Sequence, residues 1–568
     1  MKNLELAEIF RSIAKLLEVK GDNPFRIRAY ERAAQNIESI ENIEEYAEQD
    51  KLETIPAIGK DLADKIKEYL STGKIRQYEE IKKRVPEGVL ELLKVPSIGP
   101  KTAKLFYENL KIKDIPTLER FAKEGKLLEI EGIKEKTVKN IISGIALIKK
   151  GQERFDLGTA WQIAQMFIDE LHRLKVVKMI SPAGSLRRMK ETVKDIDLLV
   201  TSTDAEKAME YFCSLKEVKQ VLAKGPTKST ILSRDGIQID IRVVEPESFG
   251  AALIYFTGSK SHNIKLRTLA TKRNLLINEY GVFKDNKVVA SKTETDVYKY
   301  LGMDYIHPEL REDIGEIEAA ISHNLPKLVE LNQIKGDLHI HSNYSDGNNT
   351  ILEIAKACQQ LNYEYIAITD HSQSLRVASG LSINELKRKK KQIERINKMM
   401  EHFKVLHGTE VEIDKDGNID YPDSVLKEFD IVVGAIHSGF KQSKEQLTKR
   451  IIAACKNPHV DIIAHLTGRH WGVREPYELD FSQVFKVAKE TNTILEINAN
   501  PLRLDINDML IRAAYEKGCR FVISTDAHNI EHLRFMRFGV AMARRGWLEK
   551  NDIINCLTLD ELLKTIKR

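Results

Sequence analysis

The stretch AGSLRRMKETVKDIDLLV, residues 183–200, decides the fold of the first half of this 568-residue chain. Gly184 and Ser185 follow a strand-like run and precede a predicted helical turn, where backbone N–H groups can bind phosphate. Asp195 and Asp197 are two residues apart in a predicted strand, so both side chains point to one face. The stretch therefore predicts a sheet that presents carboxylates beside a phosphate-binding turn.

Strand-like runs follow at IQIDIRVV, which contains a third carboxylate, Asp240, and at ALIYFTG, residues 252–258. Three carboxylates on adjacent strands form a hard oxygen site that suits Mg²⁺ or Mn²⁺, and two such ions can contact the attacking and leaving oxygens of a phosphoryl transfer. Arg187 and Arg188 offer guanidinium groups to a triphosphate. A solvated strand edge with a chance Asp-x-Asp is the alternative, but the order Gly-Ser, Arg-Arg, Asp-x-Asp favours the site.

This order resembles the nucleotidyltransferase signature of the beta-like DNA polymerases of family X. The resemblance continues through YFTGSKSHNIKLR, residues 255–267. It implies that Asp195, Asp197 and Asp240 are the catalytic metal ligands and that Arg267 contacts the template strand. The residues that it assigns to the incoming dNTP are Gly184, Ser185, Arg188, Tyr255, Phe256, Gly258 and Asn263.

Residues 1–150 are predicted to form successive helices, because apolar residues recur at three- and four-residue spacing. The segments 55–66 and 95–106 share the pattern Pro-x-Ile-Gly before a helix, and 130–141 is a weaker third copy. Such a turn brings a glycine and a helix N-terminus close to phosphate. The copies resemble the helix–hairpin–helix motifs of DNA repair proteins, which makes Gly59 and Gly99 candidate DNA contacts; an ordinary turn between helices is the alternative.

The N-terminal helices also resemble the small lyase domain of family X, in which a lysine forms a Schiff base with an abasic sugar. The matching position is Lys65, with Tyr30 as a neighbour. A nucleophilic lysine needs a lowered pKa, whereas Asp61, one turn earlier, is expected to raise it. Lys65 is therefore a candidate lyase nucleophile, with a DNA-phosphate contact or a solvated helix residue as the favoured alternatives.

Eleven of the 15 histidines lie at or after His339, within seven strand-like runs and the helix-like segments between them. Alternating strands and helices imply a parallel sheet or barrel, and polar residues at strand ends are typical of its active site. The candidate metal ligands are His339, His341, Asp346, His371, Glu410, His437, His465, Asp526 and His528. Nine N and O ligands without cysteine suit two or three Mn²⁺, Zn²⁺ or Fe²⁺ ions.

This ligand pattern resembles the PHP (polymerase and histidinol phosphatase) family of metal-dependent phosphoesterases and covers residues 336–568. PHP domains attached to polymerases have often lost ligands and become structural, but all nine positions here are metal-capable, which favours an active nuclease. The basic run 387–391 lies in a helix-like segment. We interpret it as a solvated helix face, with a DNA track as the alternative.

The predicted fold is multi-domain, with an all-α N-terminal region, an α+β palm and thumb, and a C-terminal α/β PHP barrel, a distorted (β/α)7. The expected domains are a lyase-like helix–hairpin–helix domain (1–85), a second helix–hairpin–helix subdomain (86–150), a nucleotidyltransferase palm (151–245), a thumb (246–318), a linker (319–335) and the PHP barrel (336–568). A hydrophobic content of 42% excludes a disordered chain, and the net charge of +5 is only mildly basic. DNA binding must therefore come from local geometry.

Together the two halves resemble bacterial and archaeal family X polymerases with a C-terminal PHP domain. The resemblance implies a repair polymerase that fills short gaps, and a 3′–5′ exonuclease that also acts at abasic sites or blocked 3′ ends. Its partners would be gapped or primer-template DNA and dNTPs, without an obligate protein partner. No apolar run approaches the roughly 20 residues of a membrane span, and the first residues lack a signal-peptide core, so we expect a cytoplasmic protein.

Two alternatives remain open at this point. The PHP half could be an inactive scaffold on a polymerase, or the front half could be a degenerate polymerase fold that holds DNA for the nuclease. A phosphatase for small phosphate esters is disfavoured because it would leave residues 1–330 without a purpose.

Overall fold

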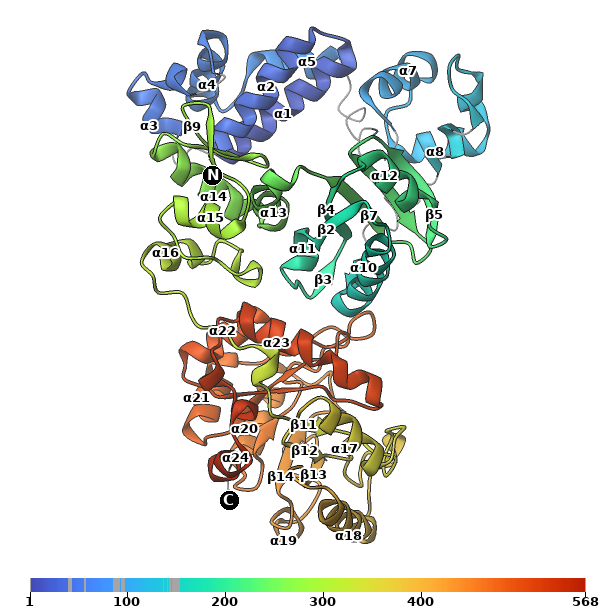
Figure 1. The fold of residues 1–568 in the computed structure, drawn as a ribbon, viewed down its shortest axis with the longest axis vertical. Helices are drawn as coiled ribbons and strands as arrows, with labels where there is room; N and C mark the ends of the chain where they lie inside the picture. Colours follow the sequence, from blue (N-terminus) through green and yellow to red (C-terminus); the bar gives the residue numbers. More distant parts are fainter. Residues whose placement is uncertain are drawn as a thin grey trace.

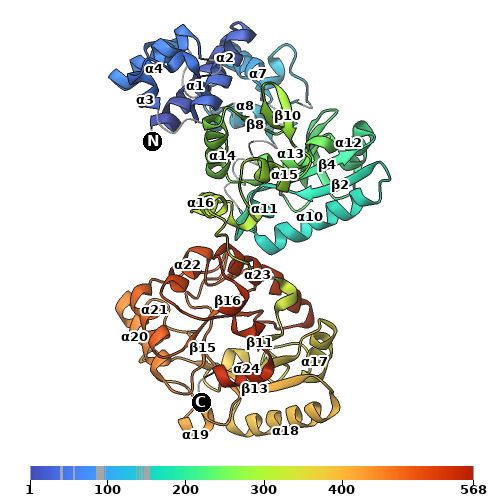
Figure 2. The same ribbon diagram turned by 60° about the vertical axis from the view of Figure 1, so that its left-hand side comes forward.

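The computed structural model describes residues 2–566 except 39–42, 56–57, 85–91, 93–94, 96–97, 136, 140, 143–144 and 146–153. The helical N-terminal region lies at one end of the molecule, the palm and thumb in the middle, and the C-terminal barrel at the other end (Figures 1 and 2). The expected boundaries at 85/86 and 150/151, and the Pro-x pairs of both repeats, lie outside the described residues. Within the described part of the chain, no helix has the length and apolar character needed to cross a bilayer.

The N-terminal region is all-α, as predicted. Its helices are α1 (Lys2–Lys20), α2 (Pro24–Glu38), α3 (Ile43–Glu48), α4 (Lys60–Thr72), α5 (Arg76–Arg84), α7 (Pro100–Leu110) and α8 (Ile115–Lys123), with 3-10 turns η1 (Leu52–Thr54) and η2 (Lys126–Glu129). The buried apolar faces of these helices form one core that includes Phe10, Leu62 and Phe106. The periodic apolar spacing in the sequence therefore reflects packing of helices on one another.

The palm is built on a five-stranded sheet in the order β2-β4-β7-β6-β5. Its strands are β2 (Val177–Pro182), β4 (Asp195–Ser202), β5 (Val218–Lys224), β6 (Lys228–Ser233) and β7 (Gln238–Val243), and a small sheet pairs β1 (Phe155–Asp156) with β3 (Thr192–Val193). Helices α10 (Leu157–His172) and α12 (Ala205–Ser214) pack on it, and the short α11 (Gly184–Arg187) follows β2. The strand, turn and helix expected around Gly184 are thus present.

The thumb contains a three-stranded sheet, β8 (Leu276–Asn278), β9 (Gly281–Lys284) and β10 (Lys287–Ala290). Its helices are α13 (Phe249–Thr257), α14 (Lys260–Lys272), α15 (Glu294–Tyr300) and α16 (Glu316–Ile321), with turns η3 (Pro246–Ser248) and η4 (Pro308–Leu310). The run ALIYFTG was expected to be a strand, and this prediction is wrong because it forms most of α13. A short apolar run that is buried on most sides carries no period that separates a helix from a strand.

The C-terminal domain contains the seven predicted strands, all parallel and in sequence order around one curved sheet. They are β11 (Gly336–Ile340), β12 (Tyr365–Ile368), β13 (Lys404–Glu412), β14 (Ile431–Ala435), β15 (Ile462–Ile463), β16 (Ile494–Asn498) and β17 (Phe521–Ser524). A bridge between Ile340 and Ala527 brings the two edges together. The sheet is therefore a nearly closed barrel.

Helices separate the barrel strands, which is the alternation expected of parallel strand pairing. Those between strands are α17 (Ile351–Gln360), α18 (Ile383–Met399), α19 (Asp423–Leu426), α20 (Lys444–Lys456), α21 (Phe481–Glu490) and α22 (Asp508–Glu516), and α23 (Met536–Arg545) and α24 (Leu559–Thr565) follow the last strand. Five 3-10 turns complete the domain: η5 (Leu331–Gln333), η6 (Arg376–Ala378), η7 (Ile530–Phe535), η8 (Lys550–Asp552) and η9 (Ile554–Cys556).

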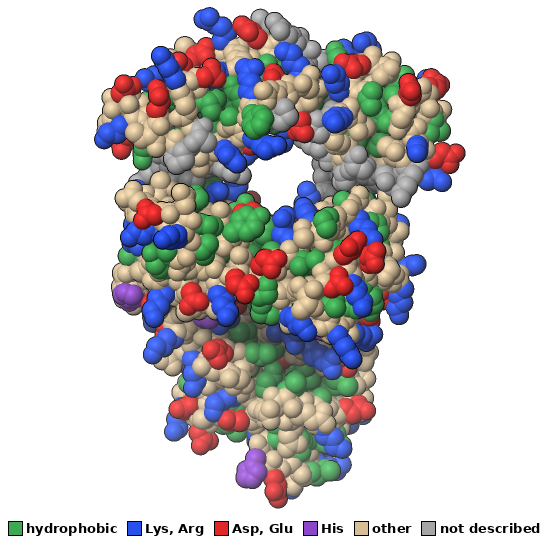
Figure 3. Space-filling model, turned by 45° about the horizontal axis from the view of Figure 1, so that its top comes forward, with side chains coloured by type: hydrophobic (Ala, Val, Ile, Leu, Met, Phe, Trp, Pro, Cys, Tyr) green, Lys and Arg blue, Asp and Glu red, His purple; other side chains and the backbone are tan. Residues whose placement is uncertain are grey.

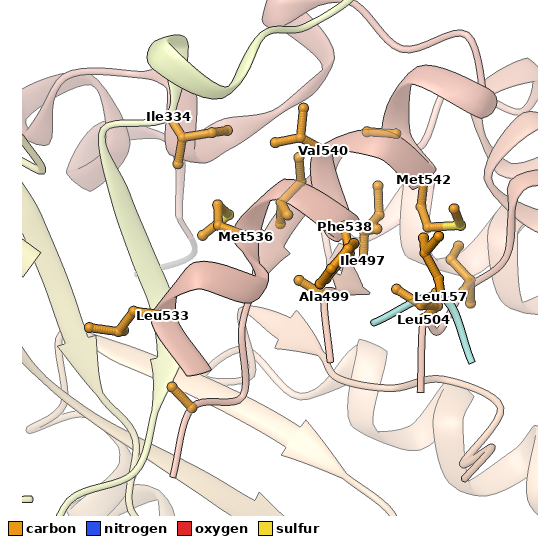
Figure 4. Close-up of a cluster of buried hydrophobic side chains, with 14 of the residues drawn as sticks. Leu157, Ile334, Ile497, Ala499, Leu504, Leu533, Met536, Phe538, Val540 and Met542 are labelled. Atoms are coloured by element: carbon orange, nitrogen blue, oxygen red, sulfur yellow. The ribbon is translucent and has the colours of Figure 1, made fainter. Parts of the chain in front are cut away.

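The palm and the barrel share an apolar contact. Leu157, at the start of α10, lies among barrel side chains that include Leu504 and Met542 (Figure 4). Next to it the palm backbone approaches the barrel so closely that a Cβ on Gly158 would lie 2.6 Å from the Pro501 side chain. Since apolar burial holds the two domains in contact, we treat them as one packed unit.

Truncation of Leu157 tests this shared core. Leu157 is completely buried, so Leu157→Ala is expected to lower the free energy of unfolding by about 2–5 kcal/mol. Urea unfolding followed by tryptophan fluorescence measures the loss, because the three tryptophans lie in these two domains. The control Leu276→Ala changes a thumb leucine that is 55% exposed. Equal urea midpoints for the two variants would contradict a shared core.

Candidate active sites

The strand register of the palm brings the three predicted carboxylates to one place. In the parallel pair β4 and β7, Asp197 lies opposite Asp240, and Asp195 lies opposite Gln238. Asp195 and Asp197 share a face because side chains alternate along a strand. Burial and the neighbouring carboxylates raise the pKa of Asp197 to about 7, and burial and Asp240 raise that of Asp195. A cation would relieve this repulsion.

Gly184 lies against these carboxylates. Its φ is +58°, and a Cβ there would lie 2.4 Å from an Asp197 carboxylate oxygen. Glycine is therefore needed both for the left-handed backbone and for the close approach. Gly184 and Ser185 begin α11, so this helical turn starts beside the carboxylates, where a phosphate group would meet both.

Asp240 makes contacts within the protein. Its carboxylate accepts hydrogen bonds from Thr230 and, at 2.8 Å, from Gln238. Within the described part of the chain, the groups of side chains that lie close enough to share a metal ion do not include the palm carboxylates. The three carboxylates fit a divalent cation by their chemistry, and the raised pKa values of Asp195 and Asp197 are consistent with such a site. Asp240 would have to change partners to join it.

The two arginines at the end of α11 have different partners. Arg187 donates two hydrogen bonds to Glu294, at 2.8 and 2.7 Å, which ties the palm to the thumb. Arg188 donates to Glu312 at 3.0 Å and to the Thr257 carbonyl oxygen at 2.7 Å. Arg187 could contact a triphosphate, as the sequence suggested, only by leaving this buried carboxylate.

Four of the predicted substrate contacts line one pocket of about 640 Å³ between α1–α2 and α13–α14. They are Tyr255, Gly258, Asn263 and Arg267, and the same pocket is lined by Arg11, Lys15, Glu31 and Lys260. The Asn263 amide donates to the Tyr255 carbonyl oxygen at 2.7 Å. The basic residues of α1 were missed by sequence reasoning, because their nearness to the thumb depends on how the N-terminal helices dock.

Phe256 lies beside this pocket. It packs edge-on against Tyr255, with ring centroids 5.0 Å apart, and the Arg242 guanidinium lies over its ring at 4.6 Å. Phe256 therefore supports the Tyr255 ring from one side. Figure 3 shows an opening between the N-terminal helices and the middle of the molecule, with Lys and Arg side chains on its rim.

Gly59 and Gly99 are the N-cap residues of α4 and α7. Both have negative φ, near −90°, and a Cβ at either would meet no atom within 4 Å. Neither backbone strain nor internal crowding therefore requires glycine here. An open backbone at a helix N-terminus suits contact with a phosphate from outside the chain.

Lys65 lies one turn after Asp61 in α4. Its ammonium group is 2.5 Å from the Asp61 carboxylate and 3.1 Å from the Asp61 carbonyl oxygen. Tyr30 donates instead to Gln77 at 2.7 Å. Lys65 would have to leave this carboxylate before its amine could attack an abasic sugar.

In the barrel, Glu410 is surrounded by histidines. Its oxygens lie 2.8 Å from His371, 3.0 Å from His465, 3.2 Å from His437 and 3.4 Å from His339. Burial would raise the pKa of Glu410, but the histidines hold it well below the usual value. Burial would likewise lower the pKa of His371, yet Glu410 and Asp346 raise it to about 10.

All nine predicted ligands come together at the carboxyl ends of the barrel strands. Three groups have ligand atoms within 4.8 Å of one another: His341, Asp346, His371 and His528; His339, His341 and Asp526; and His371, Glu410 and His437. His465 lies beside these groups, because its ring contacts the Glu410 carboxylate. Two of the ligands, His465 and Asp526, have left-handed backbones with φ of +27° and +52°, which is typical of functional sites.

The donor set fits divalent metal ions. Both ring nitrogens of His341 are buried without a hydrogen-bond partner among the described residues, and the 2.8 Å contact of His371 Nδ1 with Glu410 lacks hydrogen-bond geometry. A buried polar atom without a partner costs free energy, and a coordinated cation would satisfy several such atoms at once. Nine residues with nitrogen or oxygen donors exceed the four ligands of one tetrahedral ion.

Two further carboxylates orient the ligands. Glu496 binds His339 Nδ1 at 2.7 Å and accepts the His465 backbone N–H at 2.8 Å, and Glu412 binds His437 Nδ1 at 2.8 Å. Sequence reasoning predicted neither residue as a partner of the candidate ligands. Glu412 lies two residues after Glu410 on β13 and therefore shares its face, which is the signal that could have found it.

Arg503 was also missed. Its guanidinium lies 3.2 Å from the Asp526 carboxylate, and one of its terminal nitrogens is buried without a hydrogen-bond partner among the described residues. It thus adds positive charge beside the ligand cluster.

The basic run 387–391 is only partly the solvated face that was predicted. Lys389 is completely buried, where it lies 2.9 Å from Asp370 and donates to the Gly408 carbonyl oxygen at 3.0 Å. The prediction is wrong for this residue because α18 turns Lys389 toward the barrel. Asp370 also accepts the Ser345 hydroxyl at 2.7 Å, so the buried pair supports the loop that carries Asp346.

Fold and sites together define the class: a nucleotidyltransferase palm and thumb with helix–hairpin–helix domains, joined to a PHP metal site. Family models for a helix-hairpin-helix domain match residues 1–75, a SAM-like helix-hairpin-helix tandem 89–146, the DNA polymerase beta thumb 252–312 and a PHP domain 337–500. The chain is 41% identical to the DNA polymerase/3′-5′ exonuclease PolX of Bacillus subtilis (strain 168), over 100% of both chains. The chain therefore belongs to the PolX family.

Two other relatives match one part each. DNA polymerase lambda of Rattus norvegicus is 27% identical over 55% of this chain and 56% of its own length. A probable phosphatase of Thermoanaerobacter sp. (strain X514) is 34% identical over 34% of this chain and 78% of its own length. The two matches are consistent with two catalytic units in one chain.

Replacement of Glu496 tests how the PHP ligands are oriented. Glu496→Gln weakens the acceptor for His339, so metal affinity or nuclease activity is expected to fall about 10- to 100-fold. Metal retained after dialysis, measured by inductively coupled plasma mass spectrometry, checks the affinity. Glu490→Gln is the control, because that side chain is 59% exposed. Equal metal content in the two variants would contradict the role of Glu496.

Proposed function

We propose that this chain is a DNA-directed DNA polymerase that fills short gaps during DNA repair and carries a 3′–5′ exonuclease in its PHP domain. The observation that carries the proposal is the presence of two separate sites in one chain. One is the carboxylate face around Asp195 and Asp197 beside Gly184, and the other is the histidine cluster around Glu410. Membership in the PolX family supports both activities.

In the polymerase reaction the primer 3′-hydroxyl attacks the α-phosphate of a dNTP, and pyrophosphate leaves. Asp195, Asp197 and Asp240 would hold Mg²⁺ or Mn²⁺ ions, which when bound supply positive charge to the attacking and leaving oxygens. Gly184 and Ser185 would present backbone N–H groups to the triphosphate. The pocket with Tyr255 and Asn263 would enclose the base and sugar, and Phe256 would support the Tyr255 ring.

In the nuclease reaction water attacks a phosphodiester at the 3′ end of a strand. The nine PHP ligands would hold two or three divalent ions, Mn²⁺, Zn²⁺ or Fe²⁺, which when bound act as Lewis acids on the phosphate and lower the pKa of water. His339 and His437 would orient these ions rather than act as free bases, because the Nδ1 atom of each ring binds a carboxylate. Glu496 and Glu412 hold His339 and His437 in this way.

DNA would lie along the helix–hairpin–helix glycines. Gly59 and Gly99 have open backbones at helix N-termini, which suits binding to phosphates irrespective of sequence. Arg267 would contact the template strand from α14. Gapped or primer-template DNA is the substrate class that engages both elements.

One assay tests both activities. The protein is incubated with Mn²⁺ and a 5′-phosphorylated one-nucleotide-gap DNA labelled on the primer, with and without dNTPs. Extension with dNTPs and shortening without them are expected. Asp195→Asn is expected to reduce only extension and His339→Ala only shortening, each about 100-fold or more, because each removes a ligand from one site.

Each failure has its own meaning. Extension alone would make the PHP domain a scaffold, and shortening alone would make the polymerase fold a DNA holder. Loss of both activities in either variant would contradict two independent sites. His402→Ala, at an exposed turn, serves as the control for histidine replacement.

A further inference from the structure

The turn of residues 188–191 joins α11 to the strands that lead to the palm carboxylates, and the PHP domain holds it at both ends. At one end Arg545 donates to the Arg188 carbonyl oxygen at 2.8 Å. At the other end Arg469 pairs with Glu191 at 2.6 Å. Side chains of the nuclease domain thus fix a segment that borders the polymerase site.

Arg545 has an unusual position for an arginine. It lies at the end of α23, its side chain is only 2% exposed, and it reaches out of the barrel into the polymerase half. One terminal nitrogen also donates to Glu312 at 3.1 Å and to the Glu309 carbonyl oxygen at 3.3 Å, and the other pairs with Asp508 of α22. A buried guanidinium needs such acceptors to offset its lost hydration.

Glu312 carries this contact to the Arg188 side chain. The oxygen of Glu312 that accepts from Arg545 also accepts from Arg188 Nε, at 3.0 Å. Burial would raise the pKa of Glu312, but Arg188 and Arg545 hold it below the usual value. A single charged carboxylate therefore sits between two arginines, one from each catalytic domain.

These contacts set the direction of the Arg188 guanidinium. Its Nε is bound to Glu312 and its Nη1 to the Thr257 carbonyl oxygen at 2.7 Å. Its Nη2 donates no hydrogen bond to any of the described residues. The group is thus held on one side, with the remaining donors available to an anion.

We propose that Arg545, a residue of the PHP domain, is a positioning residue of the polymerase site. It anchors the Arg188 carbonyl oxygen and Glu312, and through them it orients the Arg188 guanidinium toward the triphosphate of a dNTP. The inference rests on the proposed role of Arg188 as a triphosphate contact. It gives the PHP domain a part in nucleotide capture that is separate from its own nuclease site.

The test is the kinetics of Arg545→Met in the full-length protein. On one-nucleotide-gap DNA the KM for dNTP is expected to rise about tenfold while kcat stays within about threefold, because the change loosens a ground-state contact. Shortening of single-stranded DNA without dNTPs is expected to match the unmodified protein. Arg545→Lys keeps the positive charge but loses the planar guanidinium and its several donors. Its KM for dNTP should therefore lie between those of the unmodified protein and of Arg545→Met.

The control is Arg537→Met, which changes an exposed arginine of the same helix and should leave all constants unchanged. Arg188→Met separates the two levels of the argument. If Arg188→Met leaves the KM for dNTP unchanged, the proposed triphosphate role of Arg188 fails. If Arg188→Met raises that KM and Arg545→Met does not, the positioning role of Arg545 is wrong.

A purely structural role for Arg545 would look different. In that case Arg545→Met would lower the melting temperature, kcat and the nuclease rate together, without a selective rise in KM. That pattern would also overturn the inference. The nuclease rate measured in the same preparation shows whether the PHP domain is folded.

Discussion

Burial of like-charged carboxylates is the constraint on which the palm depends. The β4–β7 register sets Asp197 opposite Asp240, and the strand period turns Asp195 to the same face. Burial and mutual repulsion raise the pKa of Asp197 from 3.8 to about 7. As pH rises between these values, the charge increasingly destabilises the folded state, and a bound cation offsets that cost. The strand pairing that forms the core of the palm therefore also brings together carboxylates that a divalent ion would stabilise.

In the PHP site, neighbouring histidines offset the cost of burying a carboxylate. Glu410 is buried among histidines, and Glu496 and Glu412 hold two of those rings from behind. The ligands are thus oriented by contacts within the protein. In the palm, by contrast, one of the candidate ligands, Asp240, already accepts hydrogen bonds from Thr230 and Gln238. In the PHP site the candidate metal ligands already lie together. In the palm, one carboxylate has to exchange its hydrogen-bond partners before all three can bind a cation.

Residues linked by strand period or by a turn could be predicted from the sequence. The seven barrel strands, the candidate ligands at or near their ends and the Gly184 turn follow from alternation and spacing. The α13 segment could not be assigned, because an apolar run buried on most sides has no distinctive period. The burial of Lys389 could not be foreseen either, since its partner Asp370 comes from another part of the chain. Contacts set by tertiary packing leave no local signal.

Docking of the palm on the barrel is the largest feature that the sequence does not reveal. Apolar contacts such as that of Leu157 are non-directional, and alone they would let the two surfaces slide. Hydrogen bonds depend steeply on distance and angle. Asp508 holds Arg545 within the barrel, and Arg545 donates across the interface to Arg188 and Glu312, so directional bonds restrict how the two domains dock. Directional bonds of a buried guanidinium thus turn an apolar contact into a defined geometry next to the polymerase site.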